Sequence, residues 1–242
     1  MPQSTRSSRK IEPKKASPRI VAAIPCFNTG SSIKDVVSKT RKYVDRVIVI
    51  DDGSHDGTLE EARNAGALVK IHTTNRGYGA AINSCFKEAD ADSADILVIL
   101  DGDGQHDADE IPAMLQPVLQ EEADLVIGSR FLNENGSMPK YRRFGIRAIT
   151  WLFNLLSHMK VTDAQSGFRI YTRKYFTNMP LGEKGMSVSI ETLQKAKHRH
   201  AIVKEVPISC KYTQKHLDLR STRHGLGVVL AVLKLRIQSI FW

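Results

Sequence analysis

The chain of 242 residues has few cysteines and no close pair of them. Cys26, Cys85 and Cys210 form no C-x-x-C motif, so their spacing gives no framework for a zinc site. An odd number of widely spaced cysteines is typical of reduced thiols in a cytoplasmic setting. The first residues also lack an apolar core, which argues against a signal peptide. We expect residues 1–18 to form a disordered basic arm.

No apolar run is long enough and uncharged enough to predict a membrane-spanning helix. The best candidate, residues 226–242, is interrupted by Lys234, Arg236 and Gln238. Its polar residues do not share one helical face, so both an interfacial helix and a core helix remain open. Its basic and aromatic end favours the membrane interface. We therefore expect peripheral attachment on the cytoplasmic side of a membrane.

The charge of the chain changes sign along its length. Residues 20–136 carry ten basic and twenty acidic side chains, a net −10, whereas residues 137–224 carry seventeen basic and five acidic ones, a net +12. An acidic half suits cations, and a basic half suits phosphates or anionic lipid. Solvated surface charge would explain either run alone. The sequence lacks the basic and aromatic pattern of RNA-binding proteins, so we expect no nucleic-acid partner.

Short apolar runs alternate with helical patterns through the first 129 residues. Strands are predicted at 19–25, 46–51, 68–72, 95–101 and 124–129, and helices at 31–44, 58–67, 78–91 and 109–122. This alternation predicts an α/β fold with a mostly parallel sheet covered by helices on both faces. In such sheets ligands bind beyond the carboxyl ends of the strands. Three of those ends carry the sequences PCFN, DDGS and DGDGQ.

The pattern changes after residue 136. An apolar helix is predicted at 145–159, a second helix near 187–199, and a strand at 201–208. No helix or strand is predicted for the segment between the two helices, DAQSGFRIYTR. No internal repeat is present in the sequence.

Two acidic clusters follow buried strands. In ILDGDGQH, Asp101 and Asp103 are two residues apart in a glycine-rich loop, where they can converge on one Mg²⁺ or Mn²⁺ ion. Asp and Gly are also common in plain turns. In VIVIDDGSHDGT, Asp51 and Asp52 can accept hydrogen bonds from a base or ribose, and Ser54 or Asp56 can cap the next helix.

The ordered set IPCFN, VIVIDDGSHDGT, NRGYGAAIN, DGDGQHD, GSR and DAQSGFR resembles the family 2 inverting glycosyltransferases of GT-A fold, a Rossmann-like α/β architecture. Within them the chain looks most like the dolichol-phosphate or polyprenol-phosphate mannose and hexose synthases. The resemblance covers residues 19–225 and implies that they form one GT-A catalytic domain. It implies transfer of a hexose (mannose, glucose or N-acetylglucosamine) from a GDP- or UDP-sugar to a dolichyl or polyprenyl phosphate with inversion.

The resemblance also assigns roles to single residues. The donor-binding residues would be Pro25, Phe27, Asn28, Asp51, Asp52, Gly79, Asn83 and Gln105. Asp101 and Asp103 would form the metal-binding DxD motif, with Asp103 the more direct ligand. The residues expected to bind the acceptor phosphate are Arg130, Arg142, Arg143, Ser166 and Arg169. Asp163 would position groups or act as a base, although a salt bridge to Arg169 is an equal expectation.

One departure from the family pattern concerns donor binding. Relatives usually have Asn-Glu where this chain has Asn28 and Thr29, so one carboxylate is missing and the choice of nucleotide stays open. The chain also lacks the transmembrane helices that some relatives append. Membrane attachment would then be peripheral or supplied by an anchoring partner, and a homo-oligomer is a further option.

Two other functions remain open. A related enzyme could act on a saccharide acceptor, but such enzymes usually need an acidic base where this chain is rich in arginine. A non-catalytic subunit could have kept the fold and lost turnover, for which Thr29 is the main argument. A lipid phosphate is already ionised near neutral pH, so it can attack without strong help from a base.

Overall fold

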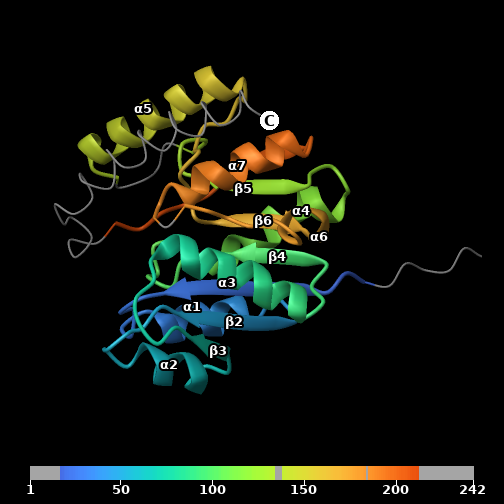
Figure 1. Cartoon of the computed structure of the whole chain (residues 1–242). Helices are drawn as coiled ribbons and strands as arrows, with labels where there is room; N and C mark the ends of the chain where they lie inside the picture. Colours follow the sequence, from blue (N-terminus) through green and yellow to red (C-terminus); the bar gives the residue numbers. More distant parts are fainter. Residues whose placement is uncertain (1–16, 134–137, 184, 213–242) are drawn as a thin grey trace, which may run out of the picture.

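The computed structural model describes residues 17–133, 138–183 and 185–212. Residues 1–16 of the predicted basic arm and the whole predicted helix at 226–242 lie outside this part. Among the described residues the chain forms a seven-stranded sheet of order β3-β2-β1-β4-β6-β5-β7 (Figure 1). Four pairings are parallel and the two made by β6 are antiparallel. The mostly parallel α/β sheet is therefore confirmed.

The predicted elements appear, most of them with shifted ends, together with others that were not predicted. The strands are β1 (Ile20–Cys26), β2 (Arg46–Asp51), β3 (Leu68–Ile71), β4 (Ile96–Ile99), β5 (Leu125–Ser129), β6 (Arg169–Thr172) and β7 (Val203–Pro207). The helices are α1 (Ile33–Thr40), α2 (Thr58–Asn64), α3 (Tyr78–Ala91), the short 3₁₀ helix η1 (Ala108–Glu110), α4 (Ile111–Leu119), α5 (Lys140–Ser157), α6 (Arg173–Phe176) and α7 (Val188–His198).

Helices cover both faces of the sheet, as the apolar strands predict. On β1, Val21 and Ala23 join a core with α3, α5, α6 and α7, whereas Ala22 and Ile24 join a second core with α1, α2 and α4. Successive side chains of a strand point to opposite faces, so an uninterrupted apolar strand supplies both cores at once. Because both faces of these strands are buried, polar side chains are found mainly at the strand ends.

Strand β6 is the main correction to the expected topology. It lies in the segment to which no element was assigned, and it inserts antiparallel between β4 and β5. Four residues are too few to show a clear alternation, and polar Arg169 and Thr172 mark its ends. The insertion brings the preceding loop, residues 163–168, to the sheet edge where β4 delivers its acidic residues.

Two helix starts also differ from the expectation. Helix α2 begins after Gly57, whose φ of +82° favours glycine, and neither Ser54 nor Asp56 occupies the N-cap position. Asp56 instead accepts hydrogen bonds from the backbone N–H and hydroxyl of Thr58. Helix α5 starts at Lys140, five residues earlier than expected, directly after Pro139. Proline cannot donate a backbone hydrogen bond, so it suits a helix start.

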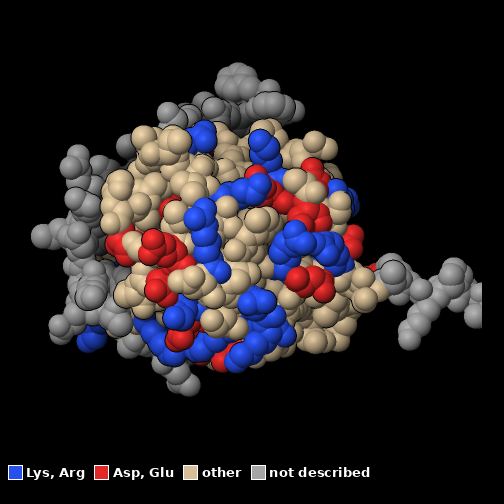
Figure 2. Space-filling view, turned by 90° about the horizontal axis from the view of Figure 1, so that it is seen from below, with Lys and Arg blue, Asp and Glu red and all other residues tan. Residues whose placement is uncertain are grey.

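The β3 edge of the sheet carries paired charges. Lys70 on β3 lies 3.0 Å from Glu88, and Lys34 lies 3.5 Å from Glu61. Figure 2, which views the side of α2 and β3, shows Lys and Arg interspersed with Asp and Glu. Charged side chains on an edge strand discourage pairing with another chain. The net −10 of residues 20–136 is therefore not an evenly acidic surface.

Helix α5 lies at the opposite end of the molecule from α2 (Figure 1). Its inner face packs into the core through Ile149 and Phe153, while Phe144 is 77% exposed and Trp151 is 65% exposed. Four basic and no acidic residues occur along this helix. No helix within the described ranges combines the length and apolarity needed to cross a bilayer.

Candidate active site

A pocket with polar and apolar walls opens where β1, β2 and β4 end, at the edge predicted from the sequence. Its cavity volume is about 300 Å³, the lower range for a small-molecule site. The strand ends contribute Pro25, Cys26, Phe27, Thr29, Asp52, Asp101, Gly102, Asp103, Gln105 and His106, and other elements contribute Tyr78, Ala81, Arg130, Arg142, Gln165, Gly167 and Met186. The first and second halves of the chain therefore face one cavity.

Asp101 and Asp103 both line this pocket, and each has its own hydrogen-bonded support. The Tyr78 hydroxyl donates to Asp101 at 3.0 Å, and Gln105 donates its side-chain and backbone N–H to Asp103 at 2.7 and 2.9 Å. Burial and the neighbouring charge of Asp103 raise the pKa of Asp101 to about 7. Burial and Asp101 also raise the pKa of Tyr78, so its hydroxyl remains a donor.

This pair of carboxylates fits a hard divalent cation. Within residues 17–133, 138–183 and 185–212 no cluster of three or more His, Cys, Asp or Glu side chains forms a metal site. Mg²⁺ commonly takes one or two protein carboxylates and completes its shell with water and substrate phosphates. A Cβ at Gly167 would lie 2.5 Å from Asp101 Oδ2, so glycine keeps the space beside this carboxylate open.

His106 is buried against this pair without joining it. Its ring packs on Phe168 with centroids 5.6 Å apart, and its Nε2 lies 4.0 Å from Asp101 Oδ2. Burial and the charge of Arg130 lower the pKa of His106 to about 3, so the imidazole is neutral.

Asp52 forms the far wall of the pocket and is fixed by three donors. His72 Nδ1 lies 2.6 Å from Oδ1, and the backbone N–H groups of Arg76 and Gly77 donate at 2.9 and 2.8 Å. The other ring nitrogen of His72 lies 2.9 Å from the Ser84 hydroxyl. The carboxylate is therefore held rigidly at the pocket wall.

Two arginines reach the pocket from the second half of the chain. Arg130 is held bidentately by buried Asp163, with N–O distances of 2.7 and 2.8 Å. Burial alone would raise the pKa of Asp163, but Arg130 holds it below its ordinary value. The Arg142 guanidinium stacks over the Tyr212 ring at 5.1 Å. Because Asp163 neutralises Arg130, Arg142 is the better source of positive charge for an anion.

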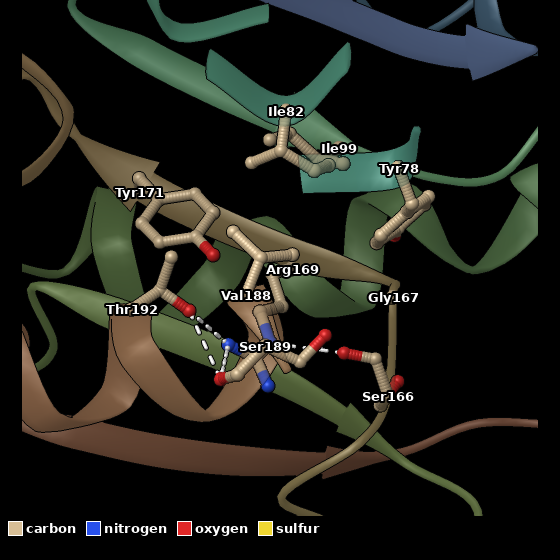
Figure 3. Close-up of a pocket in the computed structure, with 10 residues that line it drawn as sticks. All are labelled: Tyr78, Ile82, Ile99, Ser166, Gly167, Arg169, Tyr171, Val188, Ser189 and Thr192. Carbon is tan, nitrogen blue, oxygen red and sulfur yellow. Dashed lines mark hydrogen bonds between the residues drawn. The ribbon is translucent and has the colours of Figure 1, made fainter. Parts of the chain in front are cut away.

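Arg169 does not reach the pocket, which corrects the expectation that it binds a phosphate. Only 2% of it is exposed, and its guanidinium donates to the carbonyls of Ala164, Ser166 and Ser189 and to the Thr192 hydroxyl. Figure 3 shows this side chain running between the loop of Ser166 and α7. The predicted salt bridge from Asp163 to Arg169 is also wrong, since Asp163 pairs with Arg130.

The Ser166 hydroxyl likewise does not line the main pocket. It is buried at a separate small cavity that Tyr78, Arg169 and Thr192 also line (Figure 3). Among the described residues it has no hydrogen-bond partner. The neighbours Gln165 and Gly167 are the residues of this loop that line the main pocket.

Several expected donor-binding residues support the pocket from outside its lining. Asp51 accepts the Ser54 N–H at 3.1 Å and so holds its own turn. Asn28, in the left-handed backbone region, accepts the His55 N–H at 2.9 Å. The other expected residues outside the lining are the donor-binding residues Gly79 and Asn83 on α3 and the acceptor-phosphate residue Arg143 on α5.

Asn83 shows what such a supporting residue does. Its side-chain amide donates to the Leu181 carbonyl at 2.9 Å and accepts the Leu181 N–H at 3.0 Å. These two bonds fix the segment that leads to α7. The structure thus gives Asn83 a framework contact across 98 residues of sequence, rather than a place in the pocket wall.

Sequence reasoning missed three residues that hold the site. Tyr78 supports Asp101, His72 supports Asp52, and Tyr212 lies beneath Arg142. Tyr78 lies within the motif NRGYGAAIN, in which only Gly79 and Asn83 were expected to bind the donor. His72 directly follows β3 and Tyr212 lies beyond β7, and neither stands in a recognisable motif.

The chain is similar to known proteins over most of its length. The sequence model of glycosyl transferase family 2 matches residues 21–179. The chain is 33% identical over 217 residues to the UDP-N-acetylglucosamine–dolichyl-phosphate N-acetylglucosaminyltransferase of Methanococcus voltae, covering 81% of this chain and 86% of that one. It is 30% identical over 206 residues to the undecaprenyl-phosphate mannosyltransferase of Micrococcus luteus, covering 79% and 83%.

The fold has solved counterparts as well. The crystal structure of glucosyl-3-phosphoglycerate synthase from Mycobacterium tuberculosis, in complex with Mn²⁺, UDP-glucose and phosphoglyceric acid, matches with a TM-score of 0.75. The match covers 92% of this chain and 80% of that one at 23% identity, a level that speaks for the shared fold alone. Sequence motifs, architecture and relatives agree that the chain belongs to glycosyl transferase family 2.

Proposed function

We propose that the protein transfers a hexose from a nucleotide diphosphate sugar to a polyprenyl or dolichyl phosphate, with inversion and with Mg²⁺ or Mn²⁺. The observation that carries this proposal is the meeting of Asp101 and Asp103 with Arg142 in one pocket. Two relatives at 30% identity or more have names that include dolichyl phosphate or undecaprenyl phosphate. Both names support a lipid phosphate as the acceptor class.

The donor would lie along the strand ends. Asp101 and Asp103 would hold the cation, which when bound neutralises the negative charge of the leaving nucleoside diphosphate. Tyr78 and Gln105 keep the two carboxylates oriented. The nucleoside would then extend toward Asp52 and Phe27, which line the same cavity.

The acceptor would enter from the side of the arginines. Arg142 would bind and orient the attacking phosphate, since a guanidinium matches phosphate oxygens with paired N–H donors. Arg130, neutralised by Asp163, would contribute hydrogen bonding more than charge. A phosphate oxygen that is already ionised needs no general base, and a single displacement at the anomeric carbon inverts its configuration.

Helix α5 would bring this side of the pocket to a membrane surface. Its exposed aromatic residues Tyr141, Phe144 and Trp151 stand among Arg143 and other basic groups. Such a combination favours the interface of an anionic bilayer, where apolar side chains are buried and basic side chains are attracted to the lipid headgroups. Because Arg142 belongs to the same helix, the pocket and the proposed membrane contact are adjacent.

The test is a transfer assay with a labelled nucleotide sugar, Mn²⁺, and either polyprenyl phosphate in vesicles or free saccharides. We expect label in the lipid fraction. Label found only in aqueous saccharides would favour the alternative acceptor class. An inactive protein that still binds lipid phosphate would favour a non-catalytic subunit.

A substitution of Asp103 tests the proposed metal site separately. Asp103→Ala should abolish metal-dependent transfer or donor hydrolysis, because Asp103 supplies one of the two carboxylates. Asp109→Ala, on η1 outside the pocket, is the matched control and should leave both activities unchanged. Full activity of the Asp103→Ala protein would contradict the proposed metal site.

A further inference from the structure

Gln165 lies in the middle of a loop that connects the two sides of the pocket. At one end of this loop Asp163 holds Arg130 through N–O contacts of 2.7 and 2.8 Å. At the other end Gly167 lies beside the proposed metal site, because a Cβ there would be 2.5 Å from Asp101 Oδ2. The loop therefore runs from the arginine side to the carboxylate side, with Gln165 at its midpoint in sequence.

This position matches the place of the sugar that is transferred. In a single displacement the anomeric carbon lies between the leaving diphosphate and the attacking phosphate. The proposed function puts the diphosphate at Asp101 and Asp103 and the attacking phosphate at Arg142. The hexose must then occupy the space between these groups, and Gln165 lines the same cavity.

The side-chain amide of Gln165 is available to a ligand. The residue is half-buried, and the hydrogen bond that it makes among the described residues comes from its backbone N–H, which donates to Asp163 Oδ1 at 3.3 Å. The pocket side chains that already share hydrogen bonds with other side chains are Asp52, Tyr78, Asp101, Asp103, Gln105 and Arg130. Gln165 differs from them, since no described residue bonds its amide group.

An amide is well suited to a neutral sugar. Glutamine carries one acceptor oxygen and two N–H donors on the same planar group. Adjacent ring hydroxyls of a hexose present a donor and an acceptor side by side. One amide can therefore accept from the first hydroxyl and donate to the second.

Met186 supplies an apolar surface in the same cavity. Its flexible thioether side chain adapts to an irregular shape such as the C–H face of a sugar ring. The stretch before it is anchored by the Glu191 carboxylate, which accepts the backbone N–H groups of Gly182 and Glu183, each at 2.9 Å. Gln165 and Met186 thus come from separately anchored segments that line one pocket.

We propose that Gln165 binds the transferred hexose through hydrogen bonds between its amide and two adjacent ring hydroxyls, while Met186 contacts the face of the ring. This inference rests on the proposed function, because it assumes that a nucleotide sugar occupies the pocket. It goes further by assigning a residue to the sugar itself, whereas the donor contacts described above concern the nucleoside and the diphosphate. The sugar class that fits is a neutral hexose with two adjacent free hydroxyls.

Calorimetric titration of the full chain with Mn²⁺ separates the sugar from the rest of the donor. The ligands are UDP-glucose with UDP and GDP-mannose with GDP, and the pair whose nucleotide sugar binds the native chain more tightly is used. Gln165→Ala should raise the Kd of the nucleotide sugar about tenfold, since one or two hydrogen bonds are lost. The Kd of the nucleoside diphosphate should not change. Gln120→Ala, at the end of α4 and outside the pocket, is the matched control and should change neither value.

Donors that lack one ring hydroxyl test the same contact on the native protein. Removal of either hydroxyl that Gln165 bonds should weaken binding about two- to tenfold. In Gln165→Ala the same removal should have no further effect, because the effects of two groups in contact are not additive. The comparison also identifies the two hydroxyls.

Two outcomes would overturn the inference and leave the proposed function standing. If Gln165→Ala weakens the nucleotide sugar and the nucleoside diphosphate equally, or changes neither, the residue does not bind the sugar. If the deoxy donors lose the same affinity in both proteins, the hydroxyls contact other residues. Failure of both nucleotide sugars to bind the native chain with Mn²⁺ would overturn the proposed function as well.

Discussion

The Tyr78 hydroxyl donates a hydrogen bond of 3.0 Å to the Asp101 carboxylate at the base of the pocket. The bond joins the first residue of α3 to the loop after β4, so helix and sheet together set the direction of this carboxylate. Tyr78 also lines the pocket itself. We regard it as a positioning residue for the proposed metal site.

Tyr78→Phe should weaken Mn²⁺ binding about tenfold, since one hydrogen bond to a charged group is lost and the ring is kept. Titration of Mn²⁺ followed by electron paramagnetic resonance measures this directly. Tyr43→Phe is the matched control, because Tyr43 donates to Asp109 at 2.8 Å outside the pocket. Equal Mn²⁺ affinity in both variants would remove Tyr78 from this role.

Gly167→Ala should lower transfer activity and Mn²⁺ affinity together. The new Cβ would lie 2.5 Å from Asp101 Oδ2 and 3.0 Å from the Tyr78 hydroxyl, so the carboxylate must move. Gly145→Ala on α5 meets no atom within 4 Å and should leave activity intact. Its helix should even gain about 0.5–1 kcal/mol from the substitution. An active Gly167→Ala protein would show that Asp101 tolerates displacement.

Asp163→Asn should destabilise the protein by about 3–5 kcal/mol at neutral pH, because it leaves the buried Arg130 cation unpaired. Arg130 holds the folded-state pKa of Asp163 below its ordinary value. The stabilisation from this pair is therefore present above pH ~4 and is lost as the pH falls through the folded-state pKa.

Denaturant unfolding of both proteins between pH 7 and pH 3 tests this prediction. The difference in the free energy of unfolding should be largest near pH 7 and should shrink below pH ~4. A difference that stays constant over this range would mean that Asp163 does not titrate through its contact with Arg130.

Phe144→Ser combined with Trp151→Ser should weaken binding to vesicles that contain anionic lipid. Both side chains are exposed on α5, and each loses apolar surface that a membrane interface would bury. Ile202→Ser removes an exposed apolar side chain elsewhere and should leave vesicle binding unchanged. Sedimentation with vesicles distinguishes the two cases. Equal sedimentation of all three proteins would exclude α5 as the contact.

The sequence predicted the framework of the site better than its inner contacts. Continuous apolar strands ending in PCFN, DDGS and DGDGQ place Asp52 and Asp101 at one sheet edge, because parallel strands share their carboxyl ends. The partners of these groups were not predictable in the same way. His72 and Tyr78 act through contacts that depend on how β3 and α3 pack, and no local pattern encodes that packing.

The errors concern the second half of the chain. Arg169 stands in a recognisable motif, but its neighbours in space are carbonyls of α7 and of its own loop, which the sequence does not reveal. Strand β6 was overlooked because four residues with polar ends carry little periodicity. Once β6 is in place, Asp163 faces Arg130 from the adjacent loop, and the expected pairing with Arg169 becomes impossible.

The central position of β6 also bears on how the protein is made. Strands β4 and β5 are synthesised long before residues 169–172, yet each finds one of its two neighbours only when β6 arrives. Until then their apolar edges stay open, and open edges of this kind favour aggregation during synthesis. Closure by β6 therefore joins β4, which precedes Asp101, to β5, which precedes Arg130, only after residues 169–172 have been made.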